Sequence, residues 1–187
     1  IVDLGMQPGS QMYPDPSLMM DFRFELLDEF MQDEDGKELL DQPRLLSYEC
    51  SYNADGYMGE RSKIFKVMVA TNGFERELWE VLDTPVTLSI VEYVKADKKK
   101  ANKVAGVTAM RDKEAAIAPP SKTEKLFFDM DEPDMETFGK LTTFEPYGQQ
   151  SKIKNALNVF ETPVAAMLDL KPAAHKVPEV NDLDESA

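Results

Sequence analysis

Apolar and polar residues alternate along several stretches of the chain, and a period of two is the pattern of half-buried β-strands. The clearest stretch is 18–26, where every second residue is Leu, Met or Phe. A second stretch, from about 44 to 52, places Tyr48 and Tyr52 on one face with a leucine and a cysteine. The acidic segment 32–37 has the composition of a turn and predicts the end of the first strand.

A second pair of strands is predicted further along the chain. Residues 86–94 are β-branched and alternating, and 104–110 form a strand of smaller residues. A lysine-rich segment lies between the two. We therefore expect a β-hairpin with a long basic tip.

Helical spacing marks three short segments. Over 62–70 the first serine stands at an N-cap position, and Asn72-Gly73 has the chemistry of a helix stop. The apolar run 64–69 within it is also compatible with a buried strand, so both alternatives stay open. Residues 74–82 predict an amphipathic helix that ends before a proline, and 134–141 predict one or two helical turns.

Proline and glycine interrupt the pattern near the ends of the chain. Segment 1–17 holds three prolines and two glycines, which argues against a helix or a central strand, so we expect an extended arm. Residues 115–122 predict a linker, and the acidic tail beyond Pro172 is predicted to be disordered. The expected organisation is therefore this arm, a compact domain at 18–145, and a C-terminal extension with the acidic tail at 146–187.

The order of these elements predicts a mainly β protein with one or two short helices. A five-stranded barrel with a basic loop between its last two strands corresponds to the OB-fold layout, whose loops and second and third strands bind the ligand. The length of 187 residues fits one domain with extensions. We therefore expect an OB-fold-like barrel, an extended N-terminal arm and an acidic C-terminal tail.

Charge is distributed unevenly along the sequence. The net charge of −14 argues against a protein that binds nucleic acid through its overall charge. From 95 to 113, however, seven bases stand against two acids, whereas from 3 to 49 twelve acids stand against three bases. An acidic protein with one basic loop can bind a polyanion at that loop; the alternative is a solvated lysine-rich turn.

Few residues are available for catalysis or for a metal site. His175 is the only histidine and lies in the tail, and Cys50 is the only cysteine, so neither a histidine triad nor a usual zinc site is expected. The single cysteine excludes an internal disulfide and favours a reducing cytosol, and no apolar run is long enough for a membrane span. Phosphate-binding and dinucleotide-binding glycine motifs are missing. We expect a non-catalytic protein without a cofactor.

A binding surface is the remaining interpretation. Single strands are held by a cationic groove and by aromatic rings on which bases stack, each ring contributing about 1–3 kcal/mol. The alternative for each tyrosine is half-buried packing with a solvated hydroxyl group. The candidate DNA-binding residues are Arg23, Arg44, Tyr48, Tyr52, Tyr93, Lys95, Lys98, Lys99, Lys100 and Lys103.

Several landmarks resemble, in order, a family of small bacteriophage single-stranded DNA-binding proteins. They are 2–10, 13–16, 78–91, 104–107, and 126–134 followed by Phe138. The resemblance covers residues 2–145 and implies an OB-like fold, sequence-tolerant binding of single-stranded DNA, and a role in phage DNA replication or recombination in the host cytoplasm. It supplies no DNA-contact motif, so the candidate residues above come from charge and aromatic placement alone.

The acidic C-terminal tail indicates possible protein partners. The tail resembles those with which phage and bacterial single-strand binders recruit replication or recombination proteins, although it lacks a terminal aromatic residue.

Two alternative functions stay open. The first is a phage structural or protein-interaction component that binds no nucleic acid. The second is a metal-dependent nuclease that uses Asp129, Asp131 and Glu132. The sequence leaves open a homo-oligomer and the choice between DNA and RNA.

Overall fold

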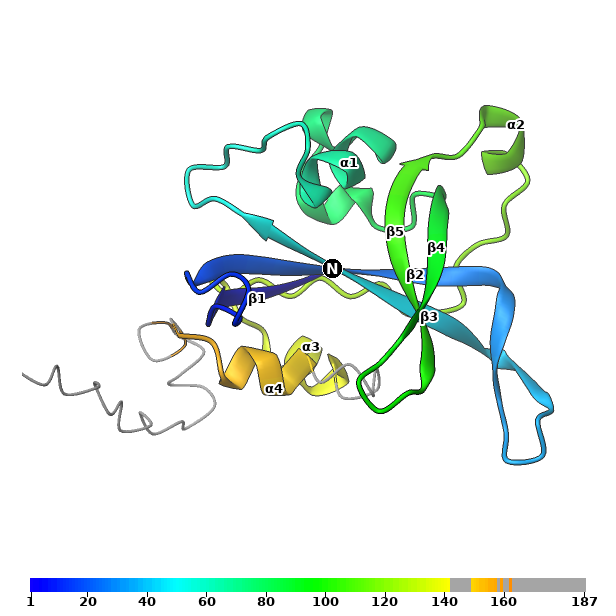
Figure 1. The fold of residues 1–187 in the computed structure, drawn as a ribbon. Coiled ribbons are helices and arrows are strands. Elements are labelled where there is room, and N and C mark those ends of the chain that lie inside the picture. Colours follow the sequence, from blue (N-terminus) through cyan, green and yellow to red (C-terminus); the bar gives the residue numbers. More distant parts are fainter. Residues whose placement is uncertain (142–148, 158, 160–161, 163–187) are drawn as a thin grey trace, which may run out of the picture.

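The structure, a computed structural model, describes residues 1–141, 149–157, 159 and 162 and is mainly β (Figure 1). The strands are β1 (Val2–Gln7), β2 (Ser17–Gln32), β3 (Glu38–Tyr52), β4 (Val86–Val94) and β5 (Lys100–Ala109). The helices are α1 (Lys63–Ala70), α2 (Asp112–Ala115), α3 (Met135–Lys140) and α4 (Gln149–Lys154), with 3-10 turns η1 (Gly73–Glu75) and η2 (Leu78–Val81).

The first sheet is antiparallel in the order β1-β2-β3. Its register pairs Phe22 with Tyr48 and Met20 with Cys50, so the apolar residues of β2 and β3 share one face. Both strands begin or end beyond the predicted ranges and meet in a turn in which the Gly36 amide donates to the Asp33 carbonyl at 3.0 Å. The two predicted strands and their acidic turn are therefore confirmed.

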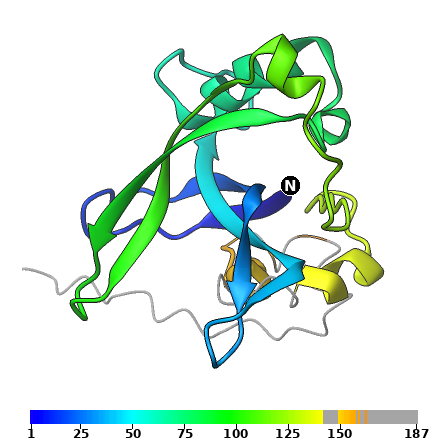
Figure 2. The ribbon, with the colours of Figure 1, turned by 90° about the vertical axis from the view of Figure 1, so that its right-hand side faces the viewer.

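The second sheet is the predicted hairpin of β4 and β5. β5 begins at Lys100, so the tip between the strands comprises only residues 95–99 and two of the lysines lie on a strand. Figure 2 shows this hairpin extending away from β1, β2 and β3.

The expected closed five-stranded barrel is wrong. Among the described residues the strands form two separate sheets, and no ladder of backbone hydrogen bonds joins β3 to β5. Side chains join the sheets instead, because Ile64 and Val67 of α1 are buried in one core with Leu46 of β3 and Val104 and Val107 of β5. The helix thus connects the sheets through packing where a closed barrel would use strand pairing.

The predicted extended arm is wrong over its first part. Residues 2–7 pair with β2 as strand β1, with Val2 and Leu4 buried. The Asp3 amide donates to the Phe128 carbonyl at 2.9 Å, and the Phe128 amide donates to the Ile1 carbonyl at 3.0 Å. All three prolines of the segment lie at position 8 or later, so they leave β1 free to pair. Gly5 has a φ of 65° at the bulge in β1, a conformation that favours glycine.

Two of the three predicted helices are confirmed. The Ser62 hydroxyl caps α1 by accepting from the Phe65 amide at 3.2 Å, and the Asp134 carboxylate caps α3. The predicted helix at 74–82 is wrong, because Arg76 is extended and separates η1 from η2. After Arg76, a reciprocal capping box between Glu77 and Glu80 stabilises the first turn of η2.

Two hydrophobic cores lie on opposite faces of the first sheet. One contains the apolar residues of β2 and β3 with α1, β4 and β5. The other contains β1, the apolar segment 126–130, α3 and α4, which cover the lower face of the sheet in Figure 1. The predicted linker, 115–122, begins at the last residue of α2 and is otherwise irregular. We call the irregular segment 116–126 the strap.

Candidate nucleic-acid interface

Backbone hydrogen bonds close the tip of the β4–β5 hairpin. The Lys95 amide donates to the Lys99 carbonyl at 2.8 Å, and the Lys98 amide donates to the Lys95 carbonyl at 2.9 Å. Lys98 adopts a left-handed conformation with φ of 64°, and the Asp97 carboxylate accepts from the Lys99 amide at 3.1 Å. The lysines of this tight turn are close together in the sequence, and their side chains extend into solvent.

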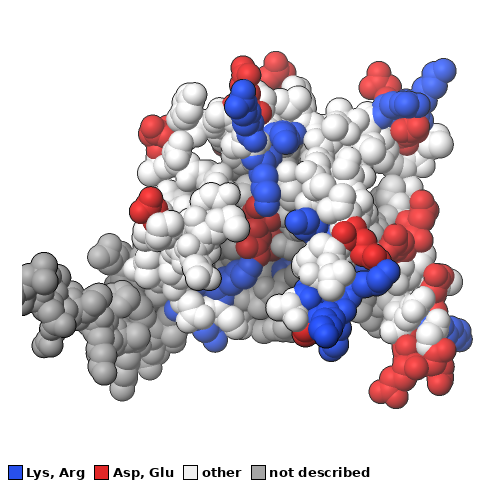
Figure 3. Space-filling view, viewed as in Figure 1, with Lys and Arg blue, Asp and Glu red and all other residues white. Residues whose placement is uncertain are grey.

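Cations outnumber acids on this hairpin. Lys99 lies 3.9 Å from Asp97, and Lys100 lies 3.0 Å from Glu92. Within the part of the chain that the structure describes, Lys95, Lys98 and Lys103 form no ion pair. Figure 3 shows the resulting cluster of basic side chains at the hairpin tip, beside the acidic tip of the β2–β3 hairpin.

An aromatic ring lies next to these lysines. Tyr93, near the end of β4, is 38% exposed, and the Lys103 ammonium lies 5.3 Å from the centre of its ring. The register pairs Tyr93 with Ala101 and Val91 with Lys103, so the tyrosine and the lysine project from the same face of the hairpin. A partly exposed ring and an unpaired ammonium group are thus available together.

A cleft of about 220 Å³ separates this part of the hairpin from β3, and we call it the hairpin cleft. It is lined by Leu46, Ser47, Glu49, Tyr93, Asn102 and Lys103. The Glu49 carboxylate accepts from Lys152 of α4, and the Lys63 ammonium donates to the Glu49 carbonyl at 3.0 Å. The lining therefore contains one cation, Lys103, and one acid, Glu49, to which two further lysines are bonded.

Sequence reasoning missed three of the residues around the cleft. Asn102 lies between two predicted DNA-binding lysines. Its polar side chain at that position was a signal that could have added it to the predicted DNA-binding residues. Lys63 of α1 is 14 residues from Glu49 and Lys152 of α4 is 103 residues from it, and the packing of these helices brings both lysines to Glu49. Nothing in the local pattern around either lysine indicates this position.

Four of the predicted site residues lie elsewhere. The Arg23 side chain is only 7% exposed and is paired with buried Asp21 at 2.9 Å, and Tyr48 is 2% exposed in the core. The Tyr52 hydroxyl donates to Asp3 at 3.0 Å, and burial, together with that carboxylate, raises the pKa of Tyr52. Arg44 pairs with Glu29 at 2.8 Å on the acidic hairpin. None of the four lines the hairpin cleft.

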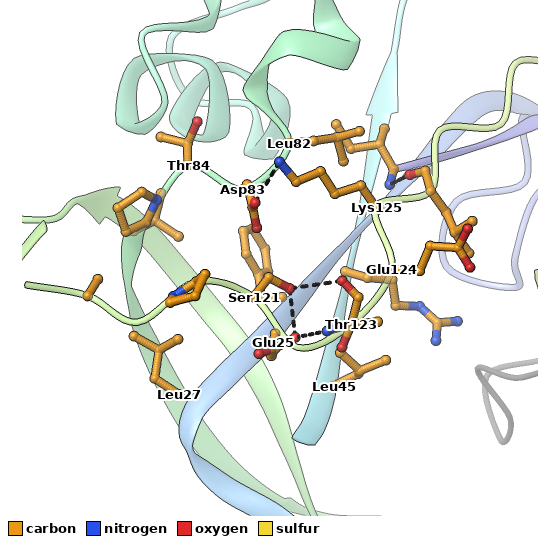
Figure 4. A pocket seen from close by; sticks show the side chains of 18 of the residues that line it. Glu25, Leu27, Leu45, Leu82, Asp83, Thr84, Ser121, Thr123, Glu124 and Lys125 are labelled. Atoms are coloured by element: carbon orange, nitrogen blue, oxygen red, sulfur yellow. Dashed lines mark hydrogen bonds and ion pairs between the residues drawn. The ribbon is translucent and has the colours of Figure 1, made fainter. Parts of the chain in front are cut away.

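A larger concavity of about 350 Å³ lies between the sheets and beneath the strap (Figure 4). Several of its polar groups pair with one another. The Glu25 carboxylate accepts from the Ser121 hydroxyl at 2.8 Å and from the Thr123 amide at 2.7 Å, and Lys125 pairs with Asp83 at 2.6 Å. Most of the remaining lining is apolar, so this concavity is unsuited to a polyanion.

The hydrogen bonds to Glu25 also set its protonation. Partial burial by itself raises the pKa of Glu25, but the hydrogen bonds from Lys122, Thr123 and Ser121 together outweigh burial and hold the pKa below its usual range. The carboxylate is therefore charged at neutral pH and connects β2 to the strap.

The acidic residues do not assemble into a metal site in the described ranges. No group of three His, Cys, Asp or Glu side chains has a metal-binding arrangement there. The Asp129 carboxylate accepts from the Asp131 amide at 2.8 Å, which is the geometry of a turn. The structure thus gives the nuclease hypothesis no support. Among the same residues, no helix has the length and apolar character needed to cross a membrane.

The predicted tail lies outside the described residues.

Comparisons of the chain with protein-family models, with curated proteins and with solved structures gave no match.

Proposed function

We propose that this protein binds single-stranded DNA without catalysis and with little sequence preference, through the β4–β5 hairpin and the hairpin cleft. The observation that carries the proposal is the pairing of Tyr93 with Lys103 beside a cluster of exposed lysines. A ring offers a base a stacking surface, and the ammonium groups offer its phosphates a counter-charge. These are the two components of sequence-tolerant single-strand binding.

The lysines supply the electrostatic component. Five lysines lie on the hairpin between 95 and 103. If all five neutralise phosphates, the logarithm of the binding constant falls with the logarithm of the salt concentration with a slope of about −3 to −4 for a single strand. Binding that depends on this hairpin is therefore strong at low salt and weak at high salt.

The ring supplies the preference for single strands. In a duplex the faces of the bases are stacked on one another, whereas an unpaired base can stack on Tyr93. The hairpin cleft is also small, with a volume of about 220 Å³, so it can accommodate part of a single strand more readily than a duplex. We therefore expect a single strand to bind more tightly than a duplex of the same length.

Fluorescence anisotropy with a labelled oligo(dT) at a series of salt concentrations tests the proposal. The expected result is saturable binding at low salt, the slope given above, and weaker competition by duplex than by single-stranded DNA. An unlabelled oligo(U) competitor determines whether DNA is preferred to RNA. The absence of binding at low salt refutes the proposal.

The biological role follows from the resemblance to phage single-strand binders. On that basis we propose that the protein supports phage DNA replication or recombination, and that its acidic tail recruits proteins of that process. Pull-down of replication and recombination proteins by the full chain, compared with a chain ending at residue 171, tests the role of the tail. Equal recovery with both chains removes it.

Exposed apolar residues favour a second candidate, a protein-interaction component. Phe74 and Trp79 are exposed on the 3-10 turns, and Val69 is exposed on α1. A stable complex with a phage protein that forms equally well without nucleic acid, together with no binding of oligo(dT), is the result that favours this candidate.

A further inference from the structure

The outer edge of β4 is unpaired in the described structure. β4 has β5 as its neighbour on one side, and none of the strands that the structure defines pairs with its other side. The register skips Ala105, so the irregular residue of this hairpin is on β5 and β4 itself is regular. A regular strand of nine residues therefore presents backbone donors and acceptors along one edge.

This edge lacks the usual protection against pairing. Exposed edge strands commonly carry lysine, proline or a bulge, which discourage another strand from adding to the sheet. The β4 sequence contains neither proline nor lysine, and its single charged residue, Glu92, is paired with Lys100 of β5. Its second half exposes Ile90, Val91 and Val94, the last with 62% of its surface accessible.

We propose that the edge of β4 pairs antiparallel with β4 of a second copy of this chain, which forms a four-stranded sheet in the order β5-β4-β4-β5. A second β4 suits the edge because the same unprotected, β-branched strand is present on both molecules. Two copies related by a two-fold axis then contact each other through the same edge. The inference does not depend on nucleic-acid binding.

Charge decides the antiparallel orientation. Each β4 is preceded by the acidic residues Glu77, Glu80 and Asp83 and followed by the basic tip. In antiparallel pairing centred on Ile90, Lys95 of one copy lies opposite Pro85 of the other, two residues from Asp83. Parallel pairing places the two basic tips side by side, where like charges repel.

The arrangement leaves the proposed DNA surface accessible. Tyr93 and Lys103 project from one face of the hairpin, while the pairing uses its edge. A two-fold axis perpendicular to the sheet brings these faces of both copies to the same side. If the proposed function holds, the dimer presents two such surfaces to one strand.

Light scattering on the full chain, without nucleic acid and over a range of protein concentrations, tests the pairing. We expect a dimer for the native chain and a monomer for Val91→Lys, which gives this edge strand the lysine that discourages pairing at other exposed edges. Val91 is 41% exposed, so the variant retains the fold. The matched control is Ile117→Lys, which makes the same change at a residue 82% exposed beyond α2. This control remains dimeric.

A cysteine variant tests the register. Ile90→Cys is expected to form a disulfide-linked dimer under mild oxidation, whereas Leu40→Cys, exposed on the other hairpin, is not. The native thiol does not interfere, because Cys50 is buried and its pKa is raised to about 12, chiefly by that burial.

Three results overturn the inference: a native chain that is monomeric at every concentration, a Val91→Lys variant that remains dimeric, or an Ile117→Lys variant that dissociates equally. A dimer that fails to bind oligo(dT) refutes the proposed function and leaves the pairing intact. A monomer that binds oligo(dT) does the reverse.

Discussion

The β2–β3 and β4–β5 hairpins have the same architecture and opposite charge. Segment 28–41 of the first holds seven acids and one base, a net charge of −6, whereas segment 92–103 of the second holds two acids and five bases, a net charge of +3. The overall charge of −14 describes neither hairpin. The comparison shows that the distribution of charge over the fold determines where a polyanion can approach.

The two hairpins also differ in how the rest of the chain holds them. The strap anchors the acidic hairpin, because Glu25 accepts hydrogen bonds from it and the Lys122 ammonium lies 4.5 Å from the centre of the Phe30 ring. Lys122 also donates to the Leu40 carbonyl at 2.9 Å. The distal half of β4 has no comparable contact in the described part of the chain. The base of the β4–β5 hairpin is held in the core through Val104 and Val107, whereas its distal half is exposed and accessible to a ligand.

Charge reversal on the basic hairpin is expected to have the largest effect. Changing Lys98, Lys99 and Lys103 together to Glu makes the two hairpins alike, so oligo(dT) affinity at low salt falls by at least about 100-fold. The matched control, Lys37→Glu at the acidic tip, changes affinity little. Anisotropy titration measures both. Equal losses in the two variants show that overall charge, and not the hairpin, governs binding.

Removal of the stacking ring is expected to have the next largest effect. Tyr93→Ala weakens oligo(dT) binding by about 5- to 150-fold, which corresponds to about 1–3 kcal/mol, whereas Tyr93→Phe retains most of the affinity. The salt slope stays the same because no cation is lost. Tyr57→Ala, at an exposed tyrosine after β3, is the control. A Tyr93→Ala variant with native affinity contradicts the stacking role.

Substitution on the side of the acidic hairpin is expected to change stability and leave binding unchanged. Glu25→Gln weakens the hydrogen bonds from the strap and lowers the free energy of unfolding by about 1–2 kcal/mol, measured by urea denaturation. Glu34→Gln, in the exposed turn, is the control. A loss of oligo(dT) affinity in Glu25→Gln shows that the strap also supports the binding hairpin.

The pH dependence of this stability has a defined sign. The folded pKa of Glu25 is lower than its unfolded value of about 4.3, so its contribution is fully present above that value and is lost as the pH falls through the folded pKa. Glu25→Gln removes this part of the acid sensitivity. If urea midpoints of the two proteins decline in parallel through the acid range, the assignment to Glu25 is wrong.

The smallest effect is expected within the hairpin cleft. Glu49 competes with phosphate for the cations around it, so Glu49→Gln raises oligo(dT) affinity by about two- to fivefold, in the range of a single surface charge interaction of up to about 1 kcal/mol. Glu38→Gln removes the same charge from the acidic hairpin and has a smaller effect. Identical gains in both variants indicate a general charge effect without a role for the cleft.

The sequence by itself determined the elements whose signals are local. The alternation over 18–26 and 44–52 placed two strands, and the lysine-rich segment correctly marked the tip of a hairpin. Ser62 and Asp134 each caps a helix within three residues of itself. Such signals are visible in the sequence because the side-chain period and the capping hydrogen bond involve only near neighbours.

Only the tertiary structure decided which faces are buried and which distant residues meet. Tyr48 lies in the core because α1 packs on its face of β3, and Arg23 is buried with Asp21, whose carboxylate accepts a hydrogen bond from Gln149 of α4. Lys152 of α4 bonds to Glu49, 103 residues away in the sequence, and β1 pairs with β2 where prolines and glycines had predicted an extended arm. These contacts depend on how separate elements pack together, and no local period in the sequence encodes that packing.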